Sequence, residues 1–172
     1  VVKLARMIGY TPSSAKSART TVNIAVQTAF PYPQSVTIGA GLVLNFTGLD
    51  NNNFVFSIPT DTSQSVDSLT GIATFSNQVL FEGLYLTDTF VKDTSQRQRF
   101  ILTNDRVDTS SMIVEVTSGT ITEKYLQATD ITKIDSTSKV FFLEESEYQI
   151  PEILFGDDII GKALTNGDVV TV

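Results

Sequence analysis

The residues from Gly156 to Lys162 have the spacing most suggestive of chemistry in this chain. They match the first seven positions of the phosphate-binding pattern G-x-x-x-x-G-K-[ST], in which backbone amides cradle the phosphates. Ala163, however, stands where that loop needs a magnesium-binding hydroxyl, and the carboxylates of Asp157 and Asp158 would repel phosphate oxygens. The turn-forming Asn166-Gly167 follows too soon to leave room for the helix that should hold the anion. The pattern therefore argues against a nucleotide site.

The adjacent carboxylates of Asp157 and Asp158 also resemble the metal-binding pair of nucleic-acid polymerases. Two-metal chemistry needs further carboxylates around the ions, and a net charge of −7 would repel nucleic acid. The structural alternative is a strand at 152–155, a run of glycine and aspartate turns, and a strand at 168–172. Asn-Gly is a strong hairpin signal, because both residues tolerate positive φ. This interpretation predicts a C-terminal hairpin whose turn residues are Gly156, Gly161, Asn166 and Gly167.

Composition removes most catalytic chemistry. The 172 residues include no cysteine and no histidine, which excludes disulfides, thiolate metal sites and Ser-His-Asp triads. A glycosidase-type pair of carboxylates is the main catalytic option left. The acidic run that begins at Glu144 could form such a site, or a calcium site, with Glu152, Asp157 or Asp158, but a solvated turn explains it better. We expect no enzyme activity, no metal and no cofactor. No apolar run approaches the roughly 18 residues needed to cross a bilayer.

Charge is unevenly distributed along the sequence. Up to Leu49 there are 4 basic residues and no acidic one, whereas from Asp50 onward there are 8 basic and 19 acidic residues. Opposite charge at the two ends favours contacts between neighbouring copies, although scattered solvated charge is the alternative interpretation. The candidate contact residues on the basic side are Lys3, Arg6, Lys16 and Arg19. Those on the acidic side are Glu144, Glu145 and Glu147.

Hydrophobic periodicity predicts a mainly β protein. Residues 1–8 place apolar side chains at helical spacing, as the end of a helix capped by Gly9, and a linker continues to Arg19. From Thr21 onward the period is two, which predicts antiparallel strands in a sandwich or open barrel. Besides 168–172, strands are expected at 21–27, 35–38, 42–46, 54–58, 79–86, 98–102, 112–116, 140–144 and 148–154.

The polar stretch Val91–Gln96 is the best position for a hinge between two β subdomains. We therefore expect a helical end and linker at 1–19, a first β region at 20–91 and a second β region at 92–172. The sequence starts inside a helical pattern and ends inside an apolar run. We expect it to be a segment of a longer protein.

Two separated segments together resemble a known family. One is the helix end from Val2 to Pro12, followed by the basic stretch that ends at Arg19. The other is Glu152–Lys162, in which a phenylalanine, glycine and aspartate precede a glycine-lysine pair. In this order they are similar to the central region of the baseplate J-like proteins, the wedge subunits of contractile phage tails. The strand and glycine turn at 35–41 add to the resemblance, and Asp158 stands where the family usually has glycine.

The resemblance implies a structural subunit of a virion tail baseplate. Such a subunit joins copies of itself and other wedge proteins into a ring around the tail tube and takes part in the rearrangement that triggers sheath contraction. It implies assembly in the host cytoplasm, with no nucleic acid, membrane insertion or small-molecule substrate. The alternative from another class is a carbohydrate-binding or adhesin-type β domain, in which Tyr32 and Tyr85 would form a sugar platform. The absence of tryptophan weakens this alternative.

Overall fold

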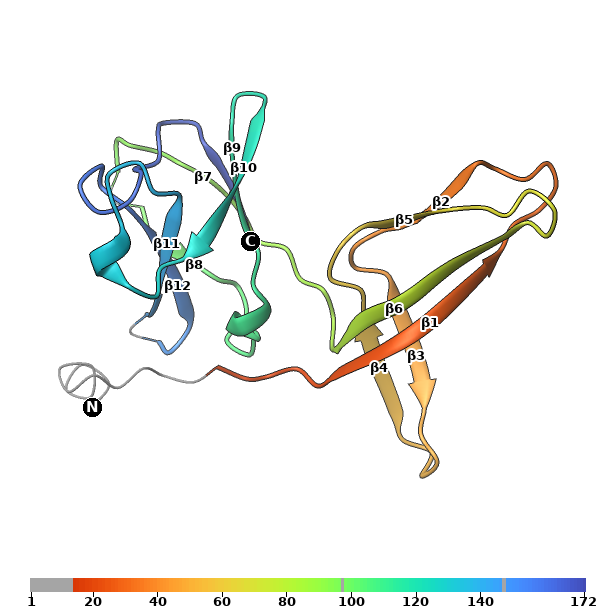
Figure 1. Ribbon diagram of the computed structural model, residues 1–172. Helices are drawn as coiled ribbons and strands as arrows, with labels where there is room; N and C mark the ends of the chain where they lie inside the picture. Colours follow the sequence, from red (N-terminus) through yellow and green to blue (C-terminus); the bar gives the residue numbers. More distant parts are fainter. Residues whose placement is uncertain (1–13, 97, 147) are drawn as a thin grey trace. The chain divides into compact units, whose positions relative to one another are not determined.

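The computed structural model describes residues 14–96, 98–146 and 148–172. Within these ranges the protein consists mainly of antiparallel β-strands, with two short 3₁₀ turns, η1 (Thr109–Ser111) and η2 (Ile131–Lys133) (Figure 1). The mainly β fold predicted from the period-two pattern is therefore confirmed. The helix end predicted at 1–8 and its glycine cap lie outside the described residues.

The chain divides into two compact units, and each is described by itself. We call them the 17–86 unit and the 87–172 unit; the second also includes the described residues Ser14–Lys16. The Ser14 hydroxyl accepts a hydrogen bond from the Thr109 amide at 3.2 Å. The division falls between Leu86 and Thr87, earlier than the boundary expected after Val91.

The stretch expected to be a hinge is instead an ordered part of the 87–172 unit. β7 (Thr89–Val91) pairs with β13 (Val169–Thr171), and the Lys92 amide donates to the Asp168 carbonyl at 2.7 Å. The Asp93 carboxylate accepts hydrogen bonds from the amide and the hydroxyl of Ser95. Short polar side chains favour such local bonds in turns. The polar run therefore makes a fixed turn and does not separate the two units.

The 17–86 unit contains a four-stranded antiparallel sheet and a two-stranded sheet. The order of the four-stranded sheet is β1 (Arg19–Gln27), β6 (Ile72–Glu82), β4 (Asn53–Ser57) and β3 (Val43–Thr47). The smaller sheet pairs β2 (Ser35–Ile38) with β5 (Thr62–Ser65). Alternation along β1 directs every second side chain inward. The small core of the unit consists of Ile38, Ile58, Ala73, Phe75 and Leu80.

The β3–β4 hairpin extends beyond the rest of this sheet (Figure 1). β4 pairs with β6 only at Phe56 and Ser57, which lie opposite Glu82 and Phe81. The other end of the hairpin, toward Leu49, has no further strand beside it among the described residues. The hairpin therefore forms a projection with its tip away from the β1–β6 ribbon.

The 87–172 unit is one seven-stranded sheet that curls into a nearly closed barrel. Its order is β7, β13, β9 (Val114–Ser118), β10 (Ile121–Gln127), β11 (Val140–Glu145), β12 (Pro151–Phe155) and β8 (Phe100–Ile101). Only β10 and β11 pair in parallel among these neighbours. The two outer strands approach each other, because the rings of Phe90 on β7 and Phe100 on β8 meet edge to face at 5.6 Å. Phe155 continues this aromatic cluster toward Tyr125 in the core.

Strands β5, β7 and β10 were not predicted, and β6 begins at Ile72 instead of Val79. The β5 sequence, Thr-Ser-Gln-Ser, is polar throughout, and its extended form follows from pairing with β2. In β10 only Tyr125 is buried, so the strand has almost no apolar alternation. Strand formation here depends on neighbouring strands more than on local propensity.

The C-terminal hairpin predicted between 152–155 and 168–172 does not form. β12 pairs with β11 and β8, whereas β13 pairs with β7 and β9. Asn166-Gly167 still turns the chain, and Gly167 has φ +88°. The Gly167 amide donates to the Lys92 carbonyl at 2.8 Å, which directs the turn toward β7. The Asn-Gly sequence therefore predicts the turn correctly but does not predict which strands β13 pairs with.

Candidate functional site

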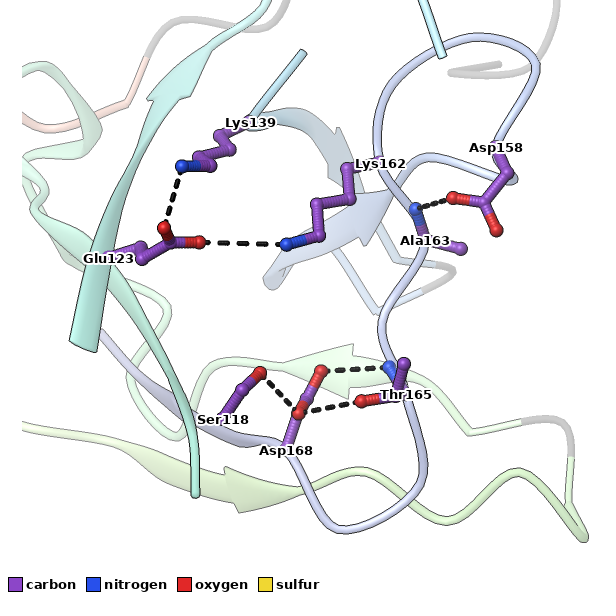
Figure 2. A network of polar contacts seen from close by, with 8 residues as sticks. All are labelled: Ser118, Glu123, Lys139, Asp158, Lys162, Ala163, Thr165 and Asp168. Atoms are coloured by element: carbon purple, nitrogen blue, oxygen red, sulfur yellow. Dashed lines mark hydrogen bonds and ion pairs between the residues drawn. The ribbon is translucent and has the colours of Figure 1, made fainter. Parts of the chain in front are cut away.

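The loop between β12 and β13 binds its own amides with its own carboxylates. Asp157 Oδ1 accepts hydrogen bonds from the amides of Ile159 and Ile160, both at 3.0 Å. Asp158 Oδ1 accepts one from the Ala163 amide at 2.8 Å (Figure 2). The amide bonds from Ile160 and Ile159 hold the pKa of Asp157 below its usual value. A phosphate cradle needs such amides to face a ligand, whereas here the protein's own anions occupy them.

Gly156 and Gly161 bring two backbone segments of this loop into contact. A Cβ atom at Gly156 would lie 2.1 Å from the Gly161 carbonyl oxygen. The Gly161 amide donates to the Asp135 carbonyl at 2.9 Å, and the Lys162 amide donates to the Ser138 carbonyl at 2.8 Å. The loop is therefore folded against itself and bonded to the turn that precedes β11. Gly156 and Gly161 thus lie in the loop between β12 and β13, and Gly161 has φ +83°.

Lys162 lies beside a carboxylate of β10. Its Nζ is 3.6 Å from Glu123 Oε2, and the Nζ of Lys139 is 2.7 Å from Glu123 Oε1 (Figure 2). The hydrogen bond from Lys139 is the main cause that lowers the pKa of Glu123, and the positive charges of both lysines add to it. The ammonium that a phosphate-binding loop would use is thus paired with a residue of the neighbouring strand.

Asp168 is buried directly after the Asn166-Gly167 turn. Its carboxylate accepts hydrogen bonds from the Ser118 hydroxyl at 2.6 Å and from the amide and hydroxyl of Thr165, both at 2.8 Å (Figure 2). Burial by itself raises the pKa of Asp168, but these hydrogen bonds outweigh it, and the net shift is downward. Asp168 anchors the turn to β9 as a hydrogen-bonded structural anion. Sequence patterns had singled it out only as the start of a strand.

The contact residues predicted from charge are distributed over both units. Lys16 is exposed and belongs to the 87–172 unit. Arg19 begins β1 in the 17–86 unit, with its guanidinium 4.7 Å from the centre of the Phe81 ring. Glu144 and Glu145 lie at the end of β11. The remaining predicted contacts lie outside the described residues: Lys3, Arg6 and Glu147.

The two tyrosines of the carbohydrate alternative lie at opposite ends of β6. Tyr32 lies over Gly71, just before β6 begins, where an added Cβ would be 2.4 Å from the tyrosine ring. Tyr85 follows the other end of β6 and lies against Gly41. An eleven-residue strand spans roughly 30 Å. The structure therefore does not bring these two rings together as one platform.

The 17–86 unit contains few charged residues. No Asp, Glu, Lys or Arg occurs from Thr20 to Leu49. The carboxylates of Asp50, Asp61 and Asp67 accept hydrogen bonds from backbone amides of their own unit. The charged residues of the unit are thus few, Arg19, Asp50, Asp61, Asp67 and Glu82, and they lie outside the run from Thr20 to Leu49.

Large apolar side chains are exposed on the same unit. Leu49, at the tip of the β3–β4 hairpin, is fully exposed. The register pairs Phe46 with Phe54, which places these two exposed rings on one face of the hairpin. Other exposed apolar residues are Phe30, Leu42, Val43, Leu69, Ile72, Val79, Leu84, Tyr85 and Leu86. Neighbouring exposed rings such as Phe46 and Phe54 can contribute to an interaction site, whereas single exposed apolar residues are ordinary. The 87–172 unit also exposes large apolar side chains, among them Ile121, Leu126 and Ile159. The sequence signal that could have found the exposed rings of the 17–86 unit is the uncharged, apolar run that ends at Leu49.

No group of three or more acidic, histidine or cysteine side chains in the described part of the chain is arranged to hold a metal ion. Within the same residues, no helix is long and apolar enough to cross a membrane. A scan against protein-family models found no match, and a search of curated proteins found none either. The geometry defines a two-unit antiparallel β protein with an internally bonded glycine-aspartate loop and one charge-poor surface.

Proposed function

We propose that this chain is a structural, non-enzymatic subunit of a contractile phage tail baseplate wedge. In this role it joins copies of itself and other wedge proteins into a ring around the tail tube. It takes part in the rearrangement that triggers sheath contraction. Its location is the tail baseplate of the virion, after assembly in the host cytoplasm.

The observation that carries the proposal is the charge-poor, apolar surface of the 17–86 unit. Soluble monomers rarely expose large contiguous apolar patches, and natural sheets protect their edge strands with charge or proline. Phe46, Phe54 and Leu49 are exposed on the projecting hairpin, where β3 and β4 carry no charged residue and Asp50 lies in the turn between them. Assembly subunits have such surfaces because neighbouring subunits cover them.

The loop at 156–162 supports a structural role in a second way. Its amides and Lys162 are bonded to side chains of the same unit, so the loop braces the barrel. Asp158 has φ +65°, a conformation that glycine adopts readily. The residue that replaces the glycine usual in the baseplate J-like family thus keeps a glycine-like backbone. This agreement favours the resemblance over a chance match.

The test is to locate this segment in intact particles. Gold-labelled antibodies raised against the 172-residue chain are applied to contractile-tailed particles that carry the sequence, in extended and contracted states. We expect a ring of label at the distal end of the tail in both states. Antibody absorbed with excess chain is the control.

Label at fibre tips or on the capsid would contradict the proposal. Fibre-tip label, together with glycan-array binding that Tyr85→Ala abolishes, would favour the adhesin alternative.

A further inference from the structure

The four-stranded sheet of the 17–86 unit has two open edges. β1 and β3 are its outermost strands, and among the described strands β1 pairs only with β6 and β3 only with β4. An edge strand presents a row of backbone donors and acceptors that another strand can bind. The two edges belong to different strands, and β3 lies on the projecting hairpin (Figure 1).

Backbone bonding shows which groups of β1 are directed away from β6. The Ala18 carbonyl accepts from the Glu82 amide at 2.8 Å, and the Thr28 amide donates to the Gly71 carbonyl at 2.9 Å. Bonding alternates along an antiparallel strand, so the even-numbered residues between them bond to β6. The amides and carbonyls of odd-numbered residues such as Ala25 therefore point outward from the sheet.

The same argument applies to β3. The Leu42 carbonyl accepts from the Ile58 amide at 3.2 Å, and the Gly48 amide donates to the Asn52 carbonyl at 2.8 Å. The even-numbered residues of β3 therefore bond to β4. The outward groups on this edge belong to Val43, Asn45 and Thr47.

Neither edge has the protection usual in monomers. From Thr20 to Gln27, and throughout β3, there is no charged residue and no proline. Edge lysines, edge prolines and inward-pointing charges are among the devices that natural sheets use against unwanted strand pairing. The one irregularity in β1, near Val22 and Ile24, is accompanied by Asn77 with φ +56° on the inner strand β6. It leaves the outer edge of β1 extended.

We infer that copies of this chain associate by strand addition, with the outer edge of β3 of one copy pairing with the outer edge of β1 of the next. The occupant of each edge is therefore a second copy of this chain. The inference rests on the proposed function, in which the subunit joins copies of itself, and it names the surface that does so.

A head-to-tail contact between two different edges covers more exposed backbone than the symmetric alternative. Pairing of β1 with β1 across a two-fold axis would leave β3 open in both copies. Pairing of β3 with β1 repeats from copy to copy and covers both edges with one kind of contact. Such heterologous contacts close into rings when the rotation between copies allows it. The strands do not repel each other, because neither carries charge beyond Arg19.

Side chains on the two edges also match by face. Ala25 on β1 and Asn45 on β3 are exposed, and each has outward backbone groups. The opposite faces carry Ile24 and Leu44, which pack against the core of the unit. A shared sheet would therefore continue the core face of one copy into that of the next.

Cysteine cross-linking tests the inference directly, because the chain has no cysteine of its own. Ala25→Cys and Asn45→Cys chains are purified separately, mixed and oxidised, and Thr21→Cys replaces Ala25→Cys in a second series to sample the register. We expect at least one mixture to give more than tenfold more disulfide-linked dimer than either of its variants alone. Efficient dimers of Ala25→Cys alone would establish two-fold pairing and overturn the inference. Absence of mixed dimers in both series would overturn it as well.

A charged edge provides the second test. Ala25→Lys places an ammonium on the open edge, whereas Thr74→Lys places the same charge on the paired residue of the inner strand β6. We expect sedimentation analysis of the full chain to show self-association weakened at least tenfold by Ala25→Lys and unchanged by Thr74→Lys. Equal effects of the two lysines would contradict strand addition.

The two proposals fail in distinguishable ways. If strand pairing fails but gold label still marks the tail baseplate, the proposed function stands without strand addition. If strand pairing holds but the label lies elsewhere on the particle, self-association by strand addition stands and the proposed baseplate function fails.

Discussion

Among the described residues, the core of the 87–172 unit contains nine buried hydrophobic side chains, whereas the core of the 17–86 unit contains five. In the larger core, Phe90, Phe100, Phe155 and Tyr125 form a continuous series of edge-to-face ring contacts. The smaller unit leaves large apolar side chains such as Phe46, Leu49 and Phe54 on its surface. The larger core gives the 87–172 unit more internal apolar packing, but both units expose large apolar side chains, which in the 87–172 unit include Ile121, Leu126 and Ile159. That those of the 17–86 unit contact a partner is part of the proposal.

The same contrast applies to charge. In the 87–172 unit, carboxylates stabilise turns and strands: Asp135 accepts from Thr137 and Ser138, and the buried Glu152 is paired with Arg99. These charged groups are engaged in the fold. It remains a prediction that assembly depends on the charged residues Lys16, Arg19, Glu144 and Glu145. Contacts between the uncharged surfaces of the 17–86 unit are the competing explanation.

The largest expected effect is that of Gly156→Ala, and it should be confined to one unit. The new Cβ would meet the Gly161 carbonyl oxygen at 2.1 Å, and backbone atoms cannot rotate aside as a side chain can. Overpacking against backbone in a hydrogen-bonded loop costs about 3 kcal/mol. We expect the 87–172 unit to lose about this much unfolding free energy while the 17–86 unit keeps its own, as measured by hydrogen exchange in urea.

Gly119→Ala is the matched control for this experiment. Gly119, unlike Gly156, has a positive φ, at +61°, and an added Cβ there would have no atom within 4 Å. Backbone strain alone then costs about 1 kcal/mol. Equal losses in the two variants would show that the close contact between Gly156 and Gly161 does not brace the loop.

Acidification should lower the free energy of unfolding by a smaller amount, and by different amounts in the two units. Among the described residues, carboxyls with a lowered pKa are concentrated in the 87–172 unit: Asp93, Glu123, Asp130, Asp135, Asp157 and Asp168. The 17–86 unit contributes Asp67. A carboxyl whose folded pKa is depressed adds stability above its unfolded pKa, which is about 4, and loses it as pH falls through the folded value. We therefore expect the 87–172 unit to lose stability more steeply below about pH 4.

Asp168→Asn sharpens this prediction. The variant keeps the shape of the side chain but removes the anion that Ser118 and Thr165 bind. It should lower stability at neutral pH and flatten the acid dependence of the 87–172 unit. Asp67→Asn is the control and should leave that unit unchanged. If the 17–86 unit unfolded at a higher pH than the 87–172 unit during acidification, the different numbers of carboxyls with lowered pKa would not explain the acid stability of the two units.

Part of this fold could be predicted from local sequence because it depends on local physics. Val22, Ile24 and Val26 alternate with polar residues and form β1 as expected. Glycine at 156 and 161 favours an irregular connection, and both residues lie in the loop between β12 and β13. In contrast, β5 pairs with β2, which lies more distant in sequence than a short window reaches. β10 pairs with the adjacent β9 and also with the later strand β11, and its own residues show almost no apolar alternation.

Long-range pairing also explains the part of the site that was missed. β13 joins β7 and β9 because Gly167 and Asp168 bond to Lys92. Nothing near Asn166 in the sequence specifies that partner. The sequence shows that the segments forming β1 and β3 carry few charges. Only the structure shows that these two strands lie at the edges of the sheet.

The most direct test of the central claim is hydrogen exchange of the full chain, dilute and assembled, at low and high salt. The account predicts that assembly slows exchange of the outward amides of β1 and β3, including Ala25 and Asn45. Because these strands carry no charge beyond Arg19, the protection should be the same at about 0.05 M and 0.5 M salt. Protection confined to the surroundings of Lys16, Glu144 and Glu145, and lost at high salt, would contradict it.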